Sequence, residues 1–229
     1  MKKLFALWMF VLVSALVWAN PAELIDQGRF REAYNEAIAA DGSAKSYAFA
    51  AMAASYYATH VAKTEKEKES WYAKAESAAK KAIDADPQSP DGYFELARAQ
   101  GRLALYRGIL ASLNLASSVR DNLKKAISLD PQYGAAYMAL AMWNLEIAQK
   151  GVGWMYGASL KRVEPLFQKA IQLDPEVIPY RVQFAKALVR LKKPAAARKQ
   201  YEKALTIPAR TWLDRVYQDQ ARKGLEGLK

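Results

Sequence analysis

The sequence predicts an all-α protein built as a superhelical array of antiparallel helix hairpins. A phrase of the form Lys-Ala-Ile-x-[Ala/Leu]-Asp-Pro occurs at residues 81–87, 125–131 and 169–175, so its prolines are 44 residues apart each time. A fixed period of about 20–50 residues is typical of stacked repeats. Alanine is abundant and strand-forming segments are scarce, as expected where helices pack closely. Each phrase favours the end of a helix, because proline disfavours the α conformation of the residue before it.

The first 19 residues have the layout of a secretory signal peptide. A basic start, Met1-Lys2-Lys3, precedes an apolar run from Leu4 to Trp18, and Val17 and Ala19 offer small residues before a cleavage point. The alternative is an uncleaved anchor, but the run is shorter than the ~20 residues of a spanning helix. We expect cleavage after Ala19, a periplasmic or secreted location, and no membrane span in the mature chain.

Composition restricts the chemistry that the chain can perform. It has no cysteine, which excludes disulfides, thiolate metal sites and a thiol nucleophile. The formal net charge is +11, of which the two lysines of the predicted signal contribute two, leaving +9 after cleavage. An exported protein has little occasion to meet nucleic acid. The charge therefore suits acidic partners or an anionic membrane surface, unless it only solvates the outer helix faces.

The 44-residue period extends into the first helix of each unit. An aromatic residue, a larger apolar residue and alanine recur with the same spacing: Phe49, Met52 and Ala53; Tyr93, Leu96 and Ala97; Tyr137, Leu140 and Ala141. These three positions share one helix face, and the alanine lets a second helix approach closely. We expect a repeat domain over residues 20–208, with units at about 22–42, 45–88, 89–132, 133–176 and 177–208, the first of them a fragment.

This order of residues, with proline closing the unit, resembles the tetratricopeptide repeat. The last hairpin fits the 34-residue form, because Ala185 and Ala197 are 12 residues apart and Tyr201 and Ala204 follow. In the three preceding hairpins the same interval is 22, which adds ten residues at each tip. Divided between two helices, they lengthen each by about 7 Å. The resemblance implies a right-handed superhelix with a concave binding groove.

Three segments narrow the resemblance. Residues 115–123, 153–157 and 204–208 are similar to the regulator of microtubule dynamics family over roughly the last 120 residues. From this family resemblance we take two expectations only: the helical repeat fold and the enlarged length of its hairpin helices. Export together with long hairpins is also similar to the small periplasmic tetratricopeptide subunits that accompany tripartite solute transporters.

No catalytic constellation is visible in the sequence. The single histidine, His60, ends an alanine-rich helix, and we expect it at the surface or at a hairpin tip. The glycines at 151–157 lack the strand and the Gly-Lys-Ser/Thr ending of a phosphate loop, and the acidic residues show no metal-ligand spacing. We therefore predict that the protein is not an enzyme and has no catalytic residues, metal or cofactor.

Binding is the remaining function, and the repeat geometry predicts where it occurs. The face of each first helix that would line the groove combines aromatic, methionine and cationic side chains. The predicted groove residues are Tyr47, Tyr57, Phe94, Arg98, Arg102, Met138, Met142, Leu145, Glu146, Lys186 and Arg190. Such a surface suits an apolar peptide or ligand with a negative group. Alternatively, the long hairpins close the groove, and Phe94 and the methionines are ordinary core.

Two further segments carry expectations. Trp154-Met155-Tyr156 lies at a glycine-flanked tip and is expected to fold back over Tyr106, Ile109 and Leu110, the alternative being contact with a membrane interface. Thr211 to Asp214 has the spacing of a capping box, which predicts a helix at 209–229 that covers the end of the array.

The sequence thus favours an exported scaffold that binds a protein or peptide in its groove, within the cell envelope. The alternative hypothesis is a carrier for a small apolar anion that serves as an accessory subunit of a solute transporter.

Overall fold

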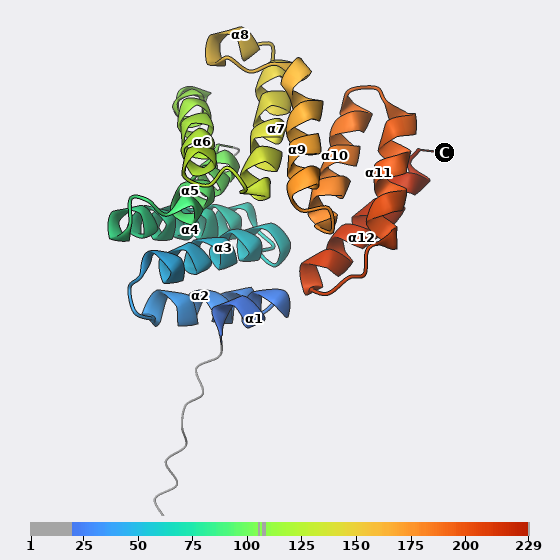
Figure 1. The fold of residues 1–229 in the computed structure, drawn as a ribbon. Helices are drawn as coiled ribbons and strands as arrows, with labels where there is room; N and C mark the ends of the chain where they lie inside the picture. The colour runs from blue at the N-terminus through green and yellow to red at the C-terminus, as the bar shows by residue number, and fades with distance from the viewer. Residues whose placement is uncertain (1–19, 105, 107–108, 229) are drawn as a thin grey trace, which may run out of the picture.

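The computed structural model describes residues 20–104, 106 and 109–228, with side chains from residue 115 onward in the last range. The predicted signal peptide at residues 1–19 lies outside the described residues. The described part contains twelve α-helices, one 3-10 turn and no strand. The expectation of an all-α array of helix hairpins is confirmed (Figure 1).

Four hairpins, α3/α4, α5/α6, α7/α9 and α10/α11, stack in chain order after the short helices α1 and α2 (Figure 1). The helix bounds are α1 Pro21–Asp26, α2 Phe30–Ala39, α3 Ala44–His60, α4 Glu65–Ala85, α5 Pro90–Leu103, α6 Ile109–Leu129, α7 Gly134–Gln149, α8 Gly153–Tyr156, the 3-10 turn η1 Leu160–Arg162, α9 Val163–Leu173, α10 Ile178–Arg190, α11 Pro194–Thr206 and α12 Trp212–Glu226.

The repeated Lys-Ala-Ile-x-[Ala/Leu]-Asp-Pro phrase forms the turn between successive hairpins. Helices α4, α6 and α9 each end at the residue before its aspartate. The side chain six residues after each proline donates a hydrogen bond back to the proline carbonyl. These pairs are Tyr93 with Pro87 (3.2 Å), Tyr137 with Pro131 (3.3 Å) and Arg181 with Pro175 (3.2 Å). The turn thereby fixes the direction in which the next hairpin starts.

The ten extra residues of the enlarged hairpins are used in two ways. In the first enlarged hairpin they lengthen both helices, because α3 has 17 residues and α4 has 21, against 13 each in α10 and α11. In the third, α7 has 16 residues but α9 only 11, and most of the added residues form α8 and η1 at the tip. Gly151 (φ 78°) and Gly157 (φ 68°) flank α8 in the left-handed region, where a side chain would be strained.

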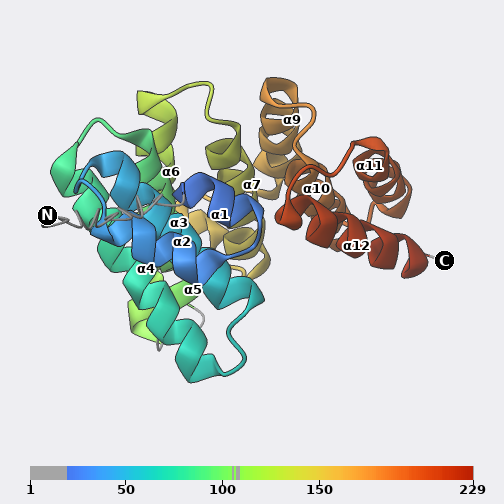
Figure 2. The same ribbon diagram turned by 90° about the horizontal axis from the view of Figure 1, so that it is seen from below.

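The last helix joins the two ends of the array. Helix α12 packs on α10 and α11 and extends back to α1 and α3 (Figures 1 and 2). The Trp212 ring lies 5.3 Å from that of Phe30 and 5.5 Å from that of His60. Gly28 (φ 80°) permits this contact, because a Cβ there would lie 2.8 Å from the Trp212 ring. The superhelix is therefore closed on itself rather than left open at both ends.

The predicted capping box at the start of α12 is confirmed. The Thr211 hydroxyl accepts a hydrogen bond from the Asp214 backbone N–H (3.1 Å), and the Asp214 carboxylate accepts one from the Thr211 N–H (3.0 Å). Along the same helix, Leu213 packs with the N-terminal core cluster, whereas Tyr217 and Leu225 pack with the C-terminal one. The helix bridges two separate parts of the core.

Candidate binding site

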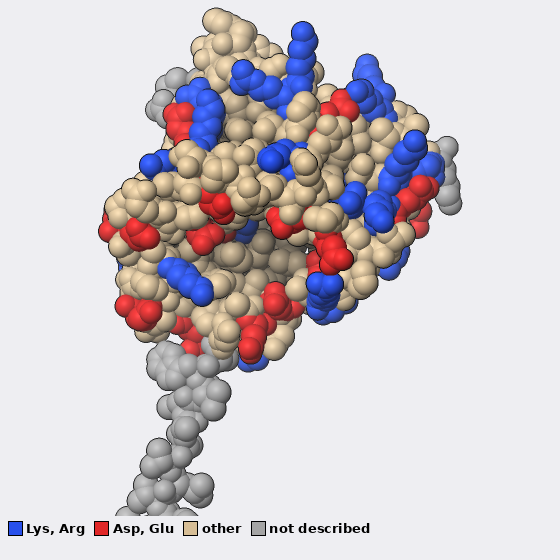
Figure 3. All heavy atoms as spheres, in the orientation of Figure 1, with Lys and Arg blue, Asp and Glu red and all other residues tan. Residues whose placement is uncertain are grey.

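The closed superhelix leaves a hollow in the face shown in Figure 3. The hollow opens between the positions that α3, α7, α10 and α12 occupy in Figure 1, and basic and acidic side chains both lie around its rim. The helices around it come from distant parts of the sequence. The side chains that these helices turn toward one another define the candidate site.

Arg98 on α5 is the centre of these contacts. Its guanidinium lies over the rings of Tyr56 (4.9 Å to the centroid) and Phe94 (4.7 Å). Its Nη2 atom is 3.4 Å from Oε1 of Glu95, whose side chain is fully buried, while the Arg98 side chain keeps 21% exposure. A guanidinium held between two ring faces and a carboxylate has a fixed direction, which suits recognition of a planar negative group.

The Glu95–Arg98 pair is buried without a complete set of hydrogen bonds. Burial raises the pKa of Glu95 to about 7, against the opposing charge of Arg98. Among the described residues, both carboxylate oxygens of Glu95 and the Nη1 atom of Arg98 lack a hydrogen-bond partner. Buried polar atoms are ordinarily satisfied, so these atoms offer unused hydrogen-bonding capacity at the centre of the fold.

Buried phenols surround this pair. Burial raises the pKa of Tyr56, Tyr133 and Tyr180, and nearby carboxylates contribute to the increase for each of them. The Tyr133 hydroxyl donates a hydrogen bond to Asp91 (2.6 Å). These phenols remain neutral at physiological pH, so they supply ring faces and hydroxyl groups rather than charge.

A second group of cations faces the same interior region. Burial, with a smaller contribution from the charge of Arg102, lowers the pKa of Lys186. Burial followed by the same Arg102 charge lowers the pKa of His60 to about 4. Lys186 also donates a hydrogen bond to Gln220 on α12 (2.6 Å). Side chains of α3, α5, α10 and α12 therefore converge, although they are up to 160 residues apart in the chain.

We call these side chains the inner cluster. It comprises Tyr56, His60, Glu95, Arg98, Arg102, Tyr133, Tyr180, Lys186 and Tyr217. Its features are three cations, one buried carboxyl, and a wall of aromatic rings. Such a surface can hold an anionic group by charge and stack apolar or planar groups beside it.

The structure brings together three of the predicted groove residues, Arg98, Arg102 and Lys186, in this cluster. Phe94 borders the cluster, because the Arg98 guanidinium lies over its ring, and the others lie elsewhere. Phe94 (3% exposed), Leu145 (0%) and Tyr57 (7%) are buried in the core, Met138 and Met142 pack against the C-terminal core, Glu146 pairs with Arg190 between α7 and α10, and Tyr47 lies beside Lys81. The eleven residues thus do not line one continuous groove. Their role in binding stays a prediction.

Several members of the inner cluster were not predicted. Tyr56 neighbours the predicted Tyr57, and only the rotation of α3 determines which of the two faces inward. His60 ends α3 at the tip of its hairpin, as expected, but its ring is half-buried beside Phe30, Tyr56 and Trp212 rather than free at the surface. The reason is the return of α12 to the N-terminal end, for which the sequence carries no periodic signal.

The described residues contain neither a group of three or more His, Cys, Asp or Glu that could hold a metal ion nor a helix long and apolar enough to cross a membrane. The arrangement supports binding through charge, hydrogen bonds and stacking.

The fold defines a tetratricopeptide-like helical solenoid whose helices enclose the inner cluster. The family model of the regulator of microtubule dynamics protein 1-3 matches residues 20–229, and the chain belongs to this family. The match is wider than the C-terminal half that the sequence motifs indicated.

Solved structures show the same fold. The tetratricopeptide protein TTC0263 of Thermus thermophilus superposes with a TM-score of 0.66 at 17% identity, covering 89% of this chain and 95% of that one. The human IFIT1 dimer with PPP-AAAA gives a TM-score of 0.62 at 17% identity, covering 91% of this chain but only 44% of IFIT1. No curated protein sequence matches this chain. At these identities the likeness concerns the fold alone.

Proposed function

We propose that this protein is a non-enzymatic binding scaffold that holds an acidic peptide segment or partner helix at the inner cluster. The observation that supports this most directly is that Arg98 and Arg102 on α5 and Lys186 on α10 belong to one cluster inside the array, where the charge of Arg102 lowers the pKa of Lys186. The fold family supports a role in protein–protein contact, since tetratricopeptide-like arrays present extended concave surfaces to partners.

The chemistry of the inner cluster favours a ligand with a negative group next to an apolar one. Arg98 has an unpaired Nη1 atom, and the ring of Tyr56 lies directly against its guanidinium. A carboxylate could pair with the part of the Arg98 side chain that stays exposed (21%) while an adjoining apolar side chain packs on the rings.

We further propose that the chain acts in the cell envelope after export. The basic and apolar start of the sequence supports this proposal. N-terminal sequencing of the protein from its own host should give a chain that begins at Asn20. Recovery of a mature chain that retains residues 1–19 would contradict it.

A second candidate is a carrier for a small apolar anion that serves as an accessory subunit of a solute transporter. The buried, unpartnered Nη1 atom of Arg98 supports it, because the anionic group of an enclosed small ligand could accept a hydrogen bond from this atom more readily than a peptide at the surface could.

Native mass spectrometry separates the two candidates. We expect the protein purified from its own host to retain a bound peptide or protein, and the Arg102→Glu/Lys186→Glu variant to lose it. The matched control is Lys199→Glu/Lys203→Glu, which reverses two exposed charges on α11. A bound small molecule that the double variant loses would favour the carrier. A ligand retained equally by both variants, with circular dichroism unchanged, would contradict the proposed site.

A further inference from the structure

The tip of the third hairpin exposes apolar side chains in an unusual concentration. Of the five large hydrophobic residues that are exposed in the described part of the chain, three lie here: Trp154 (82% exposed), Met155 (56%) and Leu160 (42%). The exposure of Trp154 and Met155 contradicts the expectation that they fold back over the neighbouring tip, whereas Tyr156 does pack against a core cluster. The side chains of Ile109 and Leu110, named in that expectation, lie outside the described part. Figure 1 shows α8 standing at the outer end of the α7/α9 hairpin.

The exposure is held in place by specific contacts. Arg120 on α6 donates a hydrogen bond to the Tyr156 carbonyl (2.8 Å), and Arg162 donates one to the Gly157 carbonyl (3.1 Å). The buried side chain of Asn144 accepts a hydrogen bond from the Ser159 N–H (2.9 Å). These bonds anchor the loop backbone on three sides. A tryptophan presented on an anchored tip indicates a surface that is covered by something in function.

The charges within the tip segment, residues 147–163, are of one sign. Between residues 147 and 163 the sequence contains three cations, Lys150, Lys161 and Arg162, and no acidic residue. Within the described residues, none of the three forms an ion pair within 4.0 Å, so their charges are not neutralised locally. Figure 3 shows basic side chains beside the tan projection at the position of α8.

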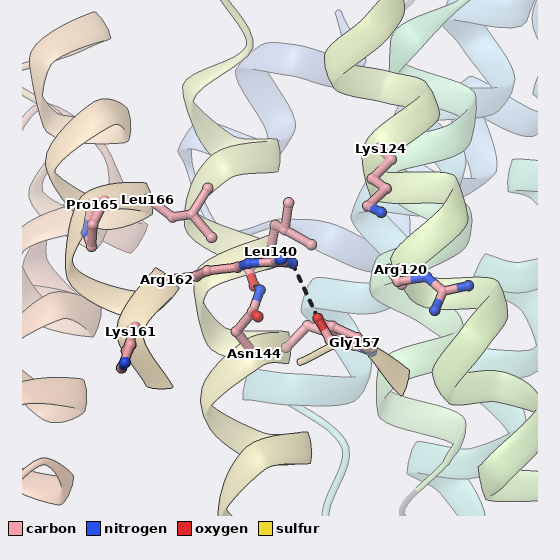
Figure 4. Close-up of a pocket in the computed structure, with 10 residues that line it drawn as sticks. Arg120, Lys124, Leu140, Asn144, Gly157, Lys161, Arg162, Pro165 and Leu166 are labelled. Carbon is pink, nitrogen blue, oxygen red and sulfur yellow. Dashed lines mark hydrogen bonds between the residues drawn. The ribbon is translucent and has the colours of Figure 1, made fainter. Parts of the chain in front are cut away.

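A pocket of about 260 Å³ continues this basic surface toward α6. Its lining includes the cations Lys124, Lys161 and Arg162, together with Arg120, which is paired with Asp121, and the apolar side chains of Leu140 and Trp143. Figure 4 shows Leu140 between Arg162 and Lys124. Figure 4 shows Arg162 extending over Leu140 toward Gly157, with Lys124 on the opposite side. A phosphate group could lie between these cations while its attached chain leaves past the apolar side chains.

We propose that the α8 tip docks on the surface of an anionic lipid bilayer. Trp154 and Met155 enter the interfacial layer, where tryptophan rings settle. Lys150, Lys161 and Arg162 contact lipid phosphates, and the adjacent pocket accepts one anionic head group. A bilayer fits this tip better than a protein groove, because the apolar side chains project from the molecule and the cations surround them. The proposal does not depend on a ligand at the inner cluster.

The absence of cysteine allows a direct test on the full chain. A single environment-sensitive fluorophore is attached at Met155→Cys, and emission is followed with phosphatidylcholine vesicles that contain or lack phosphatidylglycerol. A label at Val61→Cys, an exposed site on a different hairpin, serves as the matched control. The label reports the tip itself, so any attachment through residues 1–19 does not produce the signal.

We expect a blue shift of the Met155→Cys label with anionic vesicles only, and none at Val61→Cys. Lys150→Glu/Lys161→Glu should weaken the response about tenfold or more, whereas Lys63→Glu/Lys66→Glu should not. An unchanged label with anionic vesicles, or an equal shift with neutral ones, would overturn the proposal. So would a shift that a host protein produces and vesicles do not, because it would assign the tip to a protein partner. Circular dichroism of each variant confirms that it is folded.

Discussion

His60 shows how the neighbours of a single residue set its chemistry. Its ring lies 5.5 Å from the Trp212 ring and 6.1 Å from that of Tyr56, and Arg102 adds a positive charge to its surroundings. Both burial and that charge disfavour the protonated imidazole, so the pKa falls from 6.5 to about 4. The histidine is therefore a neutral packing residue at the contact between the two ends of the chain.

This shift makes the stability of the fold depend on pH. Because the folded-state pKa lies below that of the unfolded chain, the contribution of neutral His60 is present above pH 6.5 and is lost as pH falls toward about 4. We expect the melting temperature of the native protein to fall more over this range than that of His60→Phe. Circular dichroism melts of both proteins at a series of pH values provide the comparison.

Glu95 contributes with the opposite sign, since its raised pKa gives stability below pH 4.5 that is lost as pH rises toward about 7. That contribution is common to both proteins and cancels in their difference. Parallel melting curves at every pH would show that His60 is not shielded as described.

Among the elements, α12 depends most clearly on a local sequence signal. Its capping box satisfies backbone N–H groups at the first turn, and Ala221 is its only fully buried side chain among the described residues. Its other core-facing side chains, such as Trp212, Leu213 and Tyr217, are only partly buried, so the cap contributes to holding the first turn.

Thr211→Ala should therefore loosen the first turn of α12. We expect a local loss of about 0.5–2 kcal/mol, because the Asp214 N–H loses its side-chain acceptor. Hydrogen exchange of the α12 amides measures this. Thr206→Ala, at the end of α11, is the control, since its hydroxyl donates to the Lys203 carbonyl and caps no N–H. Equal exchange in the two variants would argue against the cap.

The α8 tip shows the opposite case, an element that the sequence marks only by its glycines. In the first enlarged hairpin the ten additional residues lengthen α3 and α4. In the third, most of the residues added between α7 and α9 form a separate projection, made of α8 and η1. The positive φ angles at Gly151 and Gly157 account for the change of direction. Glycines at the two ends of the added segment therefore let it turn away from the hairpin instead of lengthening the two helices.

At the scale of the molecule, the contact of Trp212 with Phe30 and His60 converts a linear array into a closed one. In an open solenoid each repeat contacts only its neighbours, and the terminal repeats lose structure first. Here the first and last elements support each other, and the inner cluster is held from both ends. We infer that closure positions α10 and α12 against α3 and α5.

Trp212→Ala should separate the two ends. Spin labels at Asn35→Cys on α2 and Lys223→Cys on α12 give the distance between them, and the lack of native cysteine makes the labelling specific. We expect one narrow distance distribution in the native protein and a broader, longer one in the variant. Trp154→Ala, at the most exposed tryptophan of the described chain, is the control. An unchanged distribution in Trp212→Ala would mean that other contacts close the ring.

The sequence alone determined the hairpins, the turns between them and the start of α12, because these depend on short-range chemistry: helix periodicity, the Asp-Pro turn and the capping box. It also identified Arg98, Arg102 and Lys186 as candidate site residues, since the repeat period places equivalent positions on one face.

Only the tertiary structure decided which side chains meet inside. The rotation of α3 selects Tyr56 over Tyr57, and the return of α12 brings Trp212 to His60 and Gln220 to Lys186. The orientation of α3 and the return of α12 both depend on how each hairpin is rotated relative to the one before it. These small rotations add up along the array, and no local sequence pattern encodes their sum. The proposed site therefore arises from the closure of the array, and the proposed membrane contact from the one insertion that leaves it.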